Sequence, residues 1–159
     1  MNKIYLLLGS NTGNSKAALT KAKKQIQKQI GVITRHSDLY STAAWGNFKQ
    51  PDFLNQVIIA ETELSAAETM QTILDIEKKM GRVRTVKNAP RIIDIDILLF
   101  NKEIIHLPYL NVPHPQIQNR RFVLVPLNQL SPNMIHPGLK KTIHKLLIHC
   151  PDTLNVKKF

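Results

Sequence analysis

Two aspartates, Asp94 and Asp96, stand one residue apart inside an apolar stretch that runs from Pro90 to Phe100. Successive side chains of a β-strand point to opposite faces, so the two carboxylates would share one face of a strand formed by this stretch. Their Cα atoms would lie about 6.5–7 Å apart, a spacing at which two carboxylates can converge on a pair of cations about 3.5–4 Å apart. The pattern predicts a magnesium site on one face of a buried strand.

The same alternation predicts the surroundings of the pair. Leu98 and Phe100 are expected on the aspartate face, and the core face is expected to hold Ile93, Ile95, Ile97 and Leu99. Arg91 would lie on the opposite face from Asp94 if the strand is regular that far back, so it is not the obvious ion-pair partner. A plainer interpretation stays open, because Asp-x-Asp also occurs at strand ends, where aspartates cap turns or pair with a Lys or Arg. However, two unpaired like charges on a half-buried strand cost several kcal/mol unless cations or donors satisfy them.

Composition predicts one globular domain over residues 1–159, with 43% hydrophobic and 21% charged residues. The single cysteine, Cys150, cannot form an internal disulfide, and the apolar run from Ile4 to Leu8 is shorter than a signal-peptide core. No stretch approaches the roughly 18–20 apolar residues of a membrane span. We therefore expect a complete, cytoplasmic, monomeric chain with no membrane partner.

The net charge of +11 and the pI near 10.0 imply attraction to polyanions, which include nucleic acid and equally a nucleotide triphosphate with its metal ions. Charge alone does not choose between them. Much of the excess lies on lysines that interleave with helical apolar positions, and we interpret these as a solvated helix face: Lys16, Lys21, Lys23, Lys24 and Lys28.

The first half of the chain predicts alternating strands and helices. A strand from Lys3 to Leu8 enters a turn-rich loop over 9–14, and a helix from Ser15 ends at Gly31. Strands are predicted over 32–40 and 53–63, separated by a long loop over 43–52. A capping box, Ser65-Ala66-Ala67-Glu68, starts a second helix that ends at Gly81 and whose inward stripe is Met70, Ile73, Leu74, Glu77 and Met80.

Glu77 is unusual in that stripe, because a carboxylate on an apolar face needs a partner or a task. A salt bridge to a basic residue such as Arg82 or Arg91 is the plain interpretation. The basic stretch from Arg82 to Ala89, which leads into the aspartate strand, would suit a phosphate.

After Phe100, a turn leads into a further extended stretch over 103–107. The prolines of Val112-Pro113-His114-Pro115 predict a rigid segment that fixes His114. A short helix is expected from 119, interrupted or kinked at Pro126, and a last helix over 139–149 with Leu139, Ile143, Leu146 and Leu147 inward. The order strand, helix, strand, strand, helix, strand predicts an α+β fold, a ferredoxin-like α/β sandwich with a C-terminal extension.

Other motifs in the sequence give weaker indications of function. The loop over 9–14 lacks the Lys-Ser/Thr ending of a P-loop and the spacing of a dinucleotide fingerprint, so we interpret it as a tight turn with possible ligand contact. His144 and His149 do not share a helix face and make a poor zinc site with Cys150. Neither a nucleophile elbow nor a metalloprotease signature occurs in the sequence.

Six motifs occur in chain order: Leu8-Gly9-Ser10-Asn11, Gln50-Pro51-Asp52-Phe53-Leu54-Asn55, Gly81-Arg82-Val83-Arg84, the segment from Lys87 to Leu98, Val112-Pro113-His114, and Asn119-Arg120-Arg121-Phe122. Together they resemble the 6-hydroxymethyl-7,8-dihydropterin pyrophosphokinase family of folate biosynthesis. The likeness spans about residues 1–135, and the combination of motifs is highly specific.

The resemblance implies an ATP-dependent pyrophosphokinase that transfers pyrophosphate to the hydroxymethyl group of the pterin and releases AMP. It implies that Asp94 and Asp96 hold two Mg2+ ions and act in catalysis together with Arg82 and Arg91. The implied ATP-binding residues are Glu77, Arg82, Arg84, Arg91, Ile97, His114 and Arg120. The implied pterin-binding residues are Thr42, Ala43, Trp45, Phe53, Asn55 and Phe122, with the two phenylalanines sandwiching the ring. Phosphoryl transfer asks for positioning and charge neutralisation, which metals and arginines supply, and not for a protein nucleophile.

We also consider two other classes of function. An RNA-binding module would display aromatic and basic groups on its sheet, and two carboxylates would repel a phosphate backbone without metal, so we expect no nucleic-acid partner. A nucleotidyltransferase could use the same carboxylate pair, but it would release pyrophosphate instead of AMP.

Overall fold

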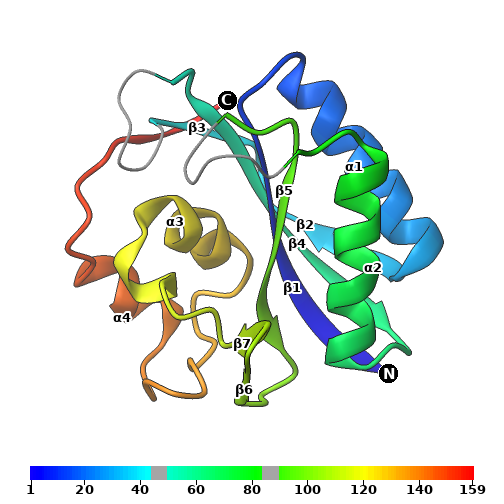
Figure 1. The fold of residues 1–159 in the computed structure, drawn as a ribbon. Coiled ribbons are helices and arrows are strands. Elements are labelled where there is room, and N and C mark those ends of the chain that lie inside the picture. Colours follow the sequence, from blue (N-terminus) through cyan, green and yellow to red (C-terminus); the bar gives the residue numbers. More distant parts are fainter. Residues whose placement is uncertain (44–49, 84–89) are drawn as a thin grey trace.

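An antiparallel sheet forms the centre of the molecule in the computed structural model, which describes residues 1–43, 50–83 and 90–159 (Figure 1). The strand order is β5 (Asp94–Phe100), β1 (Asn2–Ser10), β4 (Phe53–Thr62), β3 (Tyr40–Thr42) and β8 (Val156–Lys158). β2 (Gly31–His36) pairs with the other half of β4, and every pairing in this sheet is antiparallel. The predicted α+β class is confirmed.

Helices cover both faces of the sheet. α1 (Ser15–Gln29) and α2 (Ala66–Lys79) lie on one face, and α3 (Arg121–Leu130) and α4 (Ile143–Ile148) lie on the other (Figure 1). Alternate residues of β1 therefore enter two cores: Leu6 and Leu8 pack under α1 and α2, whereas Tyr5 and Leu7 pack under α3 and α4. Burial on both faces explains why β1 reads as a continuous apolar run.

The two long helices begin as predicted. Asn14 caps α1 by accepting a hydrogen bond from the Ala17 amide, and the capping box of α2 is complete between Ser65 and Glu68. Gly81, with φ +95°, ends the second helix in the left-handed conformation that glycine favours. The predicted inward stripe of α2 was wrong at one position. Leu74 was predicted to point inward but is only partly buried, whereas Ile76, which was not predicted, is fully buried.

The predicted strand over 32–40 is two strands. β2 and β3 are separated at Ser37, whose hydroxyl accepts a hydrogen bond from the Val57 amide, so that a side chain replaces part of the backbone ladder there. Gly31 starts β2 and does not act as a left-handed helix stop. A Cβ at this position would lie 1.9 Å from the Glu61 carbonyl oxygen, so the close approach of β4 is what requires glycine.

The alternation predicted for the aspartate strand holds only up to its middle. The pairing of β5 with β1 shifts register between Tyr5 and Leu6. Phe100 consequently packs under α1 and α2, and Leu99 packs under α3 and α4, opposite to the prediction. An extra residue in one strand of an antiparallel pair reverses the faces of the residues beyond it.

The C-terminal part supplies the second helical layer. A small hairpin, β6 (Ile105–Leu107) and β7 (Leu110–Val112), and a 3-10 turn, η1 (Ile117–Asn119), lead into α3. Pro126 was predicted to interrupt or kink this helix; an interruption is wrong, because α3 continues through Pro126 to Leu130. The last helix is shorter than predicted: Thr142 caps it at Ile143, and Leu139 is 40% exposed instead of inward. Among the described residues, no helix has the length and apolarity needed to cross a membrane.

Candidate active site

One row of residues crosses the sheet on the face that α3 covers. Gly9 of β1 is paired with Asp94 of β5 on one side and with Asn55 of β4 on the other, and Asn55 is paired in turn with Tyr40. Paired residues project to the same face, so Asp94 and Asn55 stand two strand spacings apart, roughly 10 Å, with no side chain between them. A Cβ at Gly9 would lie 2.9 Å from the Asn55 Oδ1 atom, so glycine keeps this part of the face open.

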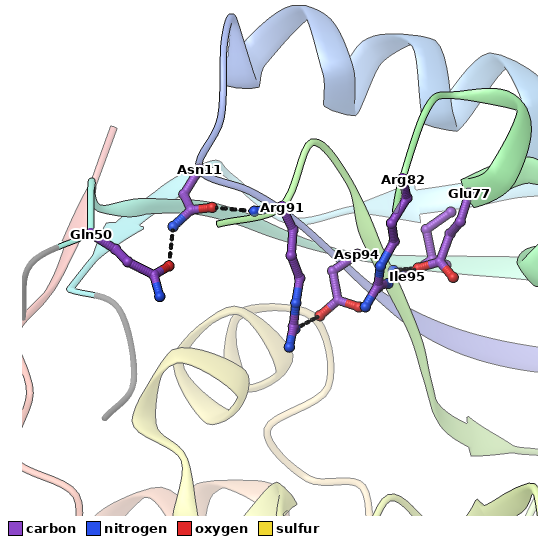
Figure 2. Close-up of polar contacts among 7 residues, drawn as sticks. All are labelled: Asn11, Gln50, Glu77, Arg82, Arg91, Asp94 and Ile95. Atoms are coloured by element: carbon purple, nitrogen blue, oxygen red, sulfur yellow. Dashed lines mark hydrogen bonds and ion pairs between the residues drawn. The ribbon is translucent and has the colours of Figure 1, made fainter. Parts of the chain in front are cut away.

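Both oxygens of Asp94 are bound by arginines. Arg82 Nη1 donates to Asp94 Oδ1 at 2.7 Å, and Arg91 Nη1 donates to Asp94 Oδ2 at 3.0 Å (Figure 2). The expectation that Arg91 is not the ion-pair partner was wrong. Its premise was a regular strand before Asp94, but β5 begins at Asp94 and the pleat alternation does not extend back to Arg91.

Glu77 joins the same network from α2. Its Oε2 atom accepts hydrogen bonds from Arg82 Nη1 and, at 2.9 Å, from the backbone N–H of Ile95. The predicted salt bridge between Glu77 and Arg82 is confirmed. Burial lowers the pKa of Arg82, but the charges of Asp94 and Glu77 outweigh it, and the net shift is upward. Arg82 stays charged between its two carboxylates.

Asp96 lies one step further along the face, opposite Leu7. Burial, followed by the charges of Asp94 and Glu77, raises the pKa of Asp96 to about 7, although Arg120 and Arg82 act in the opposite direction. Like charges that crowd a carboxyl disfavour its ionised form. A bound cation would relieve that crowding, so the pair has the electrostatics of a cation site.

His114 and Arg120 approach the aspartates from the α3 side. Burial, with help from the charge of Arg120, lowers the pKa of His114 to about 4, so its ring is neutral near pH 7. His114 Nδ1 accepts a hydrogen bond from the Gln116 amide at 3.1 Å, which leaves the proton on Nε2. Burial also lowers the pKa of Arg120, while Asp96 and Asp94 raise it. The Arg120 guanidinium lies 5.8 Å from the centroid of the Phe122 ring.

Residues 5–132 match the model of the 7,8-dihydro-6-hydroxymethylpterin-pyrophosphokinase family. The chain belongs to this family. It is 40% identical over 143 residues to 2-amino-4-hydroxy-6-hydroxymethyldihydropteridine pyrophosphokinase of Aquifex aeolicus, covering 90% of this chain and 89% of the relative. The Bacillus subtilis protein of the same name is 39% identical over 132 residues, covering 82% and 79% of the two chains.

Longer proteins also contain a region similar to this pyrophosphokinase. Folic acid synthesis protein FOL1 of Dictyostelium discoideum is 36% identical over 155 residues, which are 98% of this chain and 23% of that protein. The crystal structure of wild-type Plasmodium falciparum HPPK-DHPS with SDX-DHP has a TM-score of 0.77 at 20% identity, over 93% of this chain and 43% of that one. The chain therefore spans less than half of these longer proteins, and the structural likeness shows the fold.

Four of the residues predicted to bind pterin lie on the α3 side of the sheet at the same end as Asp94: Thr42, Phe53, Asn55 and Phe122. Thr42 of β3 is paired with Phe53 of β4, and Asn55 follows Phe53 on the same face. Among the described residues, Thr42 Oγ1 and Asn55 Nδ2 are buried without a hydrogen-bond partner. Phe122, at the start of α3, packs on the core of that side. Ala43 follows β3 directly.

Among the described residues, one predicted site residue is not brought to this face. The Ile97 side chain is buried under α1 and α2, so its predicted contact with ATP can concern only its backbone. Trp45 and Arg84 lie outside the described residues. Their predicted contacts stay predictions.

Asn11 lies in one of the six motifs but had no predicted role in the site, and it is only 4% exposed. Its side chain accepts from the Arg91 amide at 2.8 Å and donates to Gln50 Oε1 at 3.0 Å (Figure 2). It also donates to the Pro51 carbonyl at 3.2 Å. This one amide ties the segment before β4 to the segment before β5. Asparagines are common in turns, and local sequence alone did not show that this side chain would bind segments 39 and 80 positions away.

Asp94 and Asp96 fit a magnesium site that the substrate helps to complete. In the described part of the chain, no group of three or more His, Cys, Asp or Glu side chains is arranged to hold a metal ion. Magnesium is typically held by one or two carboxylates together with phosphate oxygens and water. Two carboxylates among arginines are consistent with that kind of site.

Proposed function

We propose that this chain transfers a pyrophosphoryl group from ATP to the hydroxymethyl group of 6-hydroxymethyl-7,8-dihydropterin, the reaction that its family and its relatives are named for. The pterin hydroxyl oxygen forms a bond to the β-phosphorus and its proton is released, the bond from the β-phosphorus to the oxygen of the α-phosphate breaks, and AMP leaves with that oxygen. The observation that carries this proposal is the convergence of Asp94 and Asp96 with Arg82, Arg91 and Arg120 on one sheet face.

The arginines form the phosphate side of the proposed site. Arg82 and Arg91 already contact Asp94, and Arg120 lies close enough to Asp96 and Asp94 for their charges to raise its pKa. Guanidinium groups bind phosphate oxygens with paired hydrogen bonds and stay charged when buried. His114, neutral with its proton on Nε2, can donate one further hydrogen bond to a phosphate without adding charge.

Asp94 and Asp96 would hold two magnesium ions, which when bound neutralise the triphosphate and polarise its phosphorus–oxygen bonds. The chain's own part is to hold the two carboxylates at a fixed spacing on the rigid strand β5. Arg82, through its bond to Glu77, keeps one guanidinium beside them.

The pterin side of the proposed site lies across Gly9. Asn55 Nδ2 and Thr42 Oγ1 are buried polar atoms that need partners, and a pterin offers acceptors along one edge. Phe53 and Phe122 would stack on the two faces of the ring. The bare surface at Gly9 then lets the hydroxymethyl group reach the phosphates held beside Asp94.

The experiment that tests this function identifies the nucleotide product. The protein is incubated with ATP, magnesium and the hydroxymethyl pterin, and the nucleotides are separated. We expect one AMP per pterin consumed, and only in the presence of a divalent metal. ADP as product would indicate a simple kinase, and free pyrophosphate would indicate the nucleotidyltransferase class.

Three broader properties belong to the same proposal. The strand order β5-β1-β4 followed by β2 and β3, with two crossing helices on one face, supports a ferredoxin-like sandwich, to which α3, α4 and β8 add the second layer. We propose that residues 1–159 act as a single domain, because both cores draw on the same sheet. We further propose a cytoplasmic monomer that acts on small molecules and not on nucleic acid.

A further inference from the structure

Glu77, which the resemblance gives as an ATP-binding residue, is buried, and the contacts described for its carboxylate are with Arg82 and the Ile95 amide. Its side chain is 3% exposed, and its Oε2 atom is occupied by Arg82 and by the Ile95 amide. Because β5 is an edge strand and the Ile95 N–H faces away from β1, this bond fixes the Glu77 carboxylate to the strand that carries Asp94. The Glu77 carboxylate therefore helps to fix the position of β5 and Arg82 in the site.

Arg82 is shared between a buried and a more open carboxylate. Its Nη1 atom contacts both Glu77 Oε2 and Asp94 Oδ1, while its own side chain is 7% exposed and that of Asp94 is 20% exposed. A cation that approaches Asp94 from solvent therefore meets oxygens that Arg82 and Arg91 already occupy. The bond between Arg82 and Glu77 is more deeply buried, so it does not occupy an oxygen that the cation would bind.

We propose that Glu77 is a positioning residue that holds Arg82 in the site. When Asp94 binds a metal ion, Arg82 exchanges its contact with Asp94 for a contact with a phosphate of the ligand. This inference rests on the proposed function, because it requires a metal at Asp94. A guanidinium has five N–H donors, so Arg82 can keep Glu77 while it releases Asp94. A metal ion that binds without nucleotide must then displace the arginines from Asp94 while they gain no new partner. When nucleotide binds with the metal ion, its phosphates become the new partners of the arginines.

The test measures binding of Mn2+ to the ligand-free protein by the loss of its free electron paramagnetic resonance signal, at one fixed pH. Arg82→Gln removes the guanidinium that competes with the cation for Asp94, and it is expected to tighten Mn2+ binding about fivefold or more. Glu77→Gln leaves Asp94 as the main partner of Arg82, and this variant is expected to weaken Mn2+ binding by a similar factor. Lys78→Gln and Glu63→Gln, at exposed positions, make the same changes of charge and are expected to leave binding unchanged.

The double variant separates exchange from simple attraction between charges. If Glu77 acts through Arg82, Glu77→Gln loses most of its effect in the Arg82→Gln background. Additive effects of the two substitutions would overturn the proposal, because they would show that each charge acts on the metal independently. If Glu77→Gln fails to fold, the 15N resonance of Arg82 Nε in the wild-type protein supplies a second readout. It is expected to shift as Mg2+ binds, and a resonance that stays fixed at saturation would overturn the exchange.

A further arm separates this inference from the proposed function. In the ligand-free protein, Asp94→Asn is expected to abolish most Mn2+ binding. If binding survives in that variant, the proposed metal site is wrong and the inference falls with it. If Asp94→Asn abolishes binding while Glu77→Gln and Arg82→Gln act additively, only the exchange is wrong.

Discussion

Asn11 and Arg91 form a reciprocal pair, in which the Asn11 backbone N–H donates to the Arg91 carbonyl at 3.0 Å and the Arg91 backbone N–H donates to Asn11 Oδ1 at 2.8 Å. The backbone of Arg91 is thereby fixed to the end of β1. Its guanidinium then reaches Asp94 from a fixed origin. The same asparagine also binds Gln50 and Pro51, so one buried side chain sets the approach of two segments that border the site.

We expect Asn11→Ala to reduce both stability and turnover. The substitution removes three hydrogen bonds made by the buried Asn11 side chain, which costs on the order of 1–3 kcal/mol, and it frees Arg91 to move relative to Asp94. Thermal unfolding and steady-state kinetics measure the two effects. Asn14→Ala is the matched control, because it removes the N-cap of α1, which costs about 1 kcal/mol, without touching Arg91. Equal losses of turnover in the two variants would show that Asn11 matters only for stability.

Asp94→Asn and Asp96→Asn are each expected to remove most turnover while the fold is retained. Each substitution deletes a carboxylate that the proposed mechanism gives to a metal, and loss of one such electrostatic element should raise the barrier by at least ~3 kcal/mol. Turnover is measured at saturating magnesium, with Asp75→Asn on the exposed face of α2 as the control. Near wild-type rates in both site variants would contradict the metal role.

The sequence was sufficient for the elements whose patterns are local. The capping box at Ser65, the periodicity of α1 and the turn at Gly81 each depend on residues within a few positions of one another, and each prediction is confirmed. The aspartate pair could also be found, because carboxylates in an apolar strand contradict the local pattern and point to function.

The remaining features depend on contacts between distant segments. The faces of Leu99 and Phe100 follow from a register shift against β1, which nothing in residues 94–100 encodes. Arg91 reaches Asp94 because Asn11, 80 positions away in the sequence, fixes its backbone before the strand begins. Pattern rules that assume a regular strand cannot anticipate either result.

Asn55→Ala is expected to weaken pterin binding at least tenfold while the KM for ATP stays within about twofold, because its amide is proposed to pair with the pterin edge and not with phosphate. Calorimetry with the pterin in the absence of ATP measures the first quantity directly. Tyr40→Phe is the control from the same row of the sheet, since the Tyr40 hydroxyl donates to Gln129 and not toward the proposed site. Parallel losses of pterin and ATP binding would indicate a general distortion of β4.

The raised pKa of Asp96 predicts an unusual dependence of stability on pH in the metal-free protein. Its folded-state pKa of about 7 exceeds its ordinary value of 3.8, so the folded protein holds this proton more tightly than the unfolded chain does. The contribution to the free energy of unfolding is therefore complete below pH about 4 and is lost as pH rises through about 7. Between pH 5 and pH 8 in a chelator, the wild-type protein should lose on the order of 2 kcal/mol relative to Asp96→Asn. This value is below the full shift because the window begins at pH 5, above the ordinary pKa of 3.8. Urea unfolding of both proteins at the two pH values measures this difference, and Asp75→Asn should behave like the wild type. Identical pH dependence in the wild type and Asp96→Asn would show that Asp96 ionises normally and that the crowding of charge at the pair is relieved in the ligand-free protein.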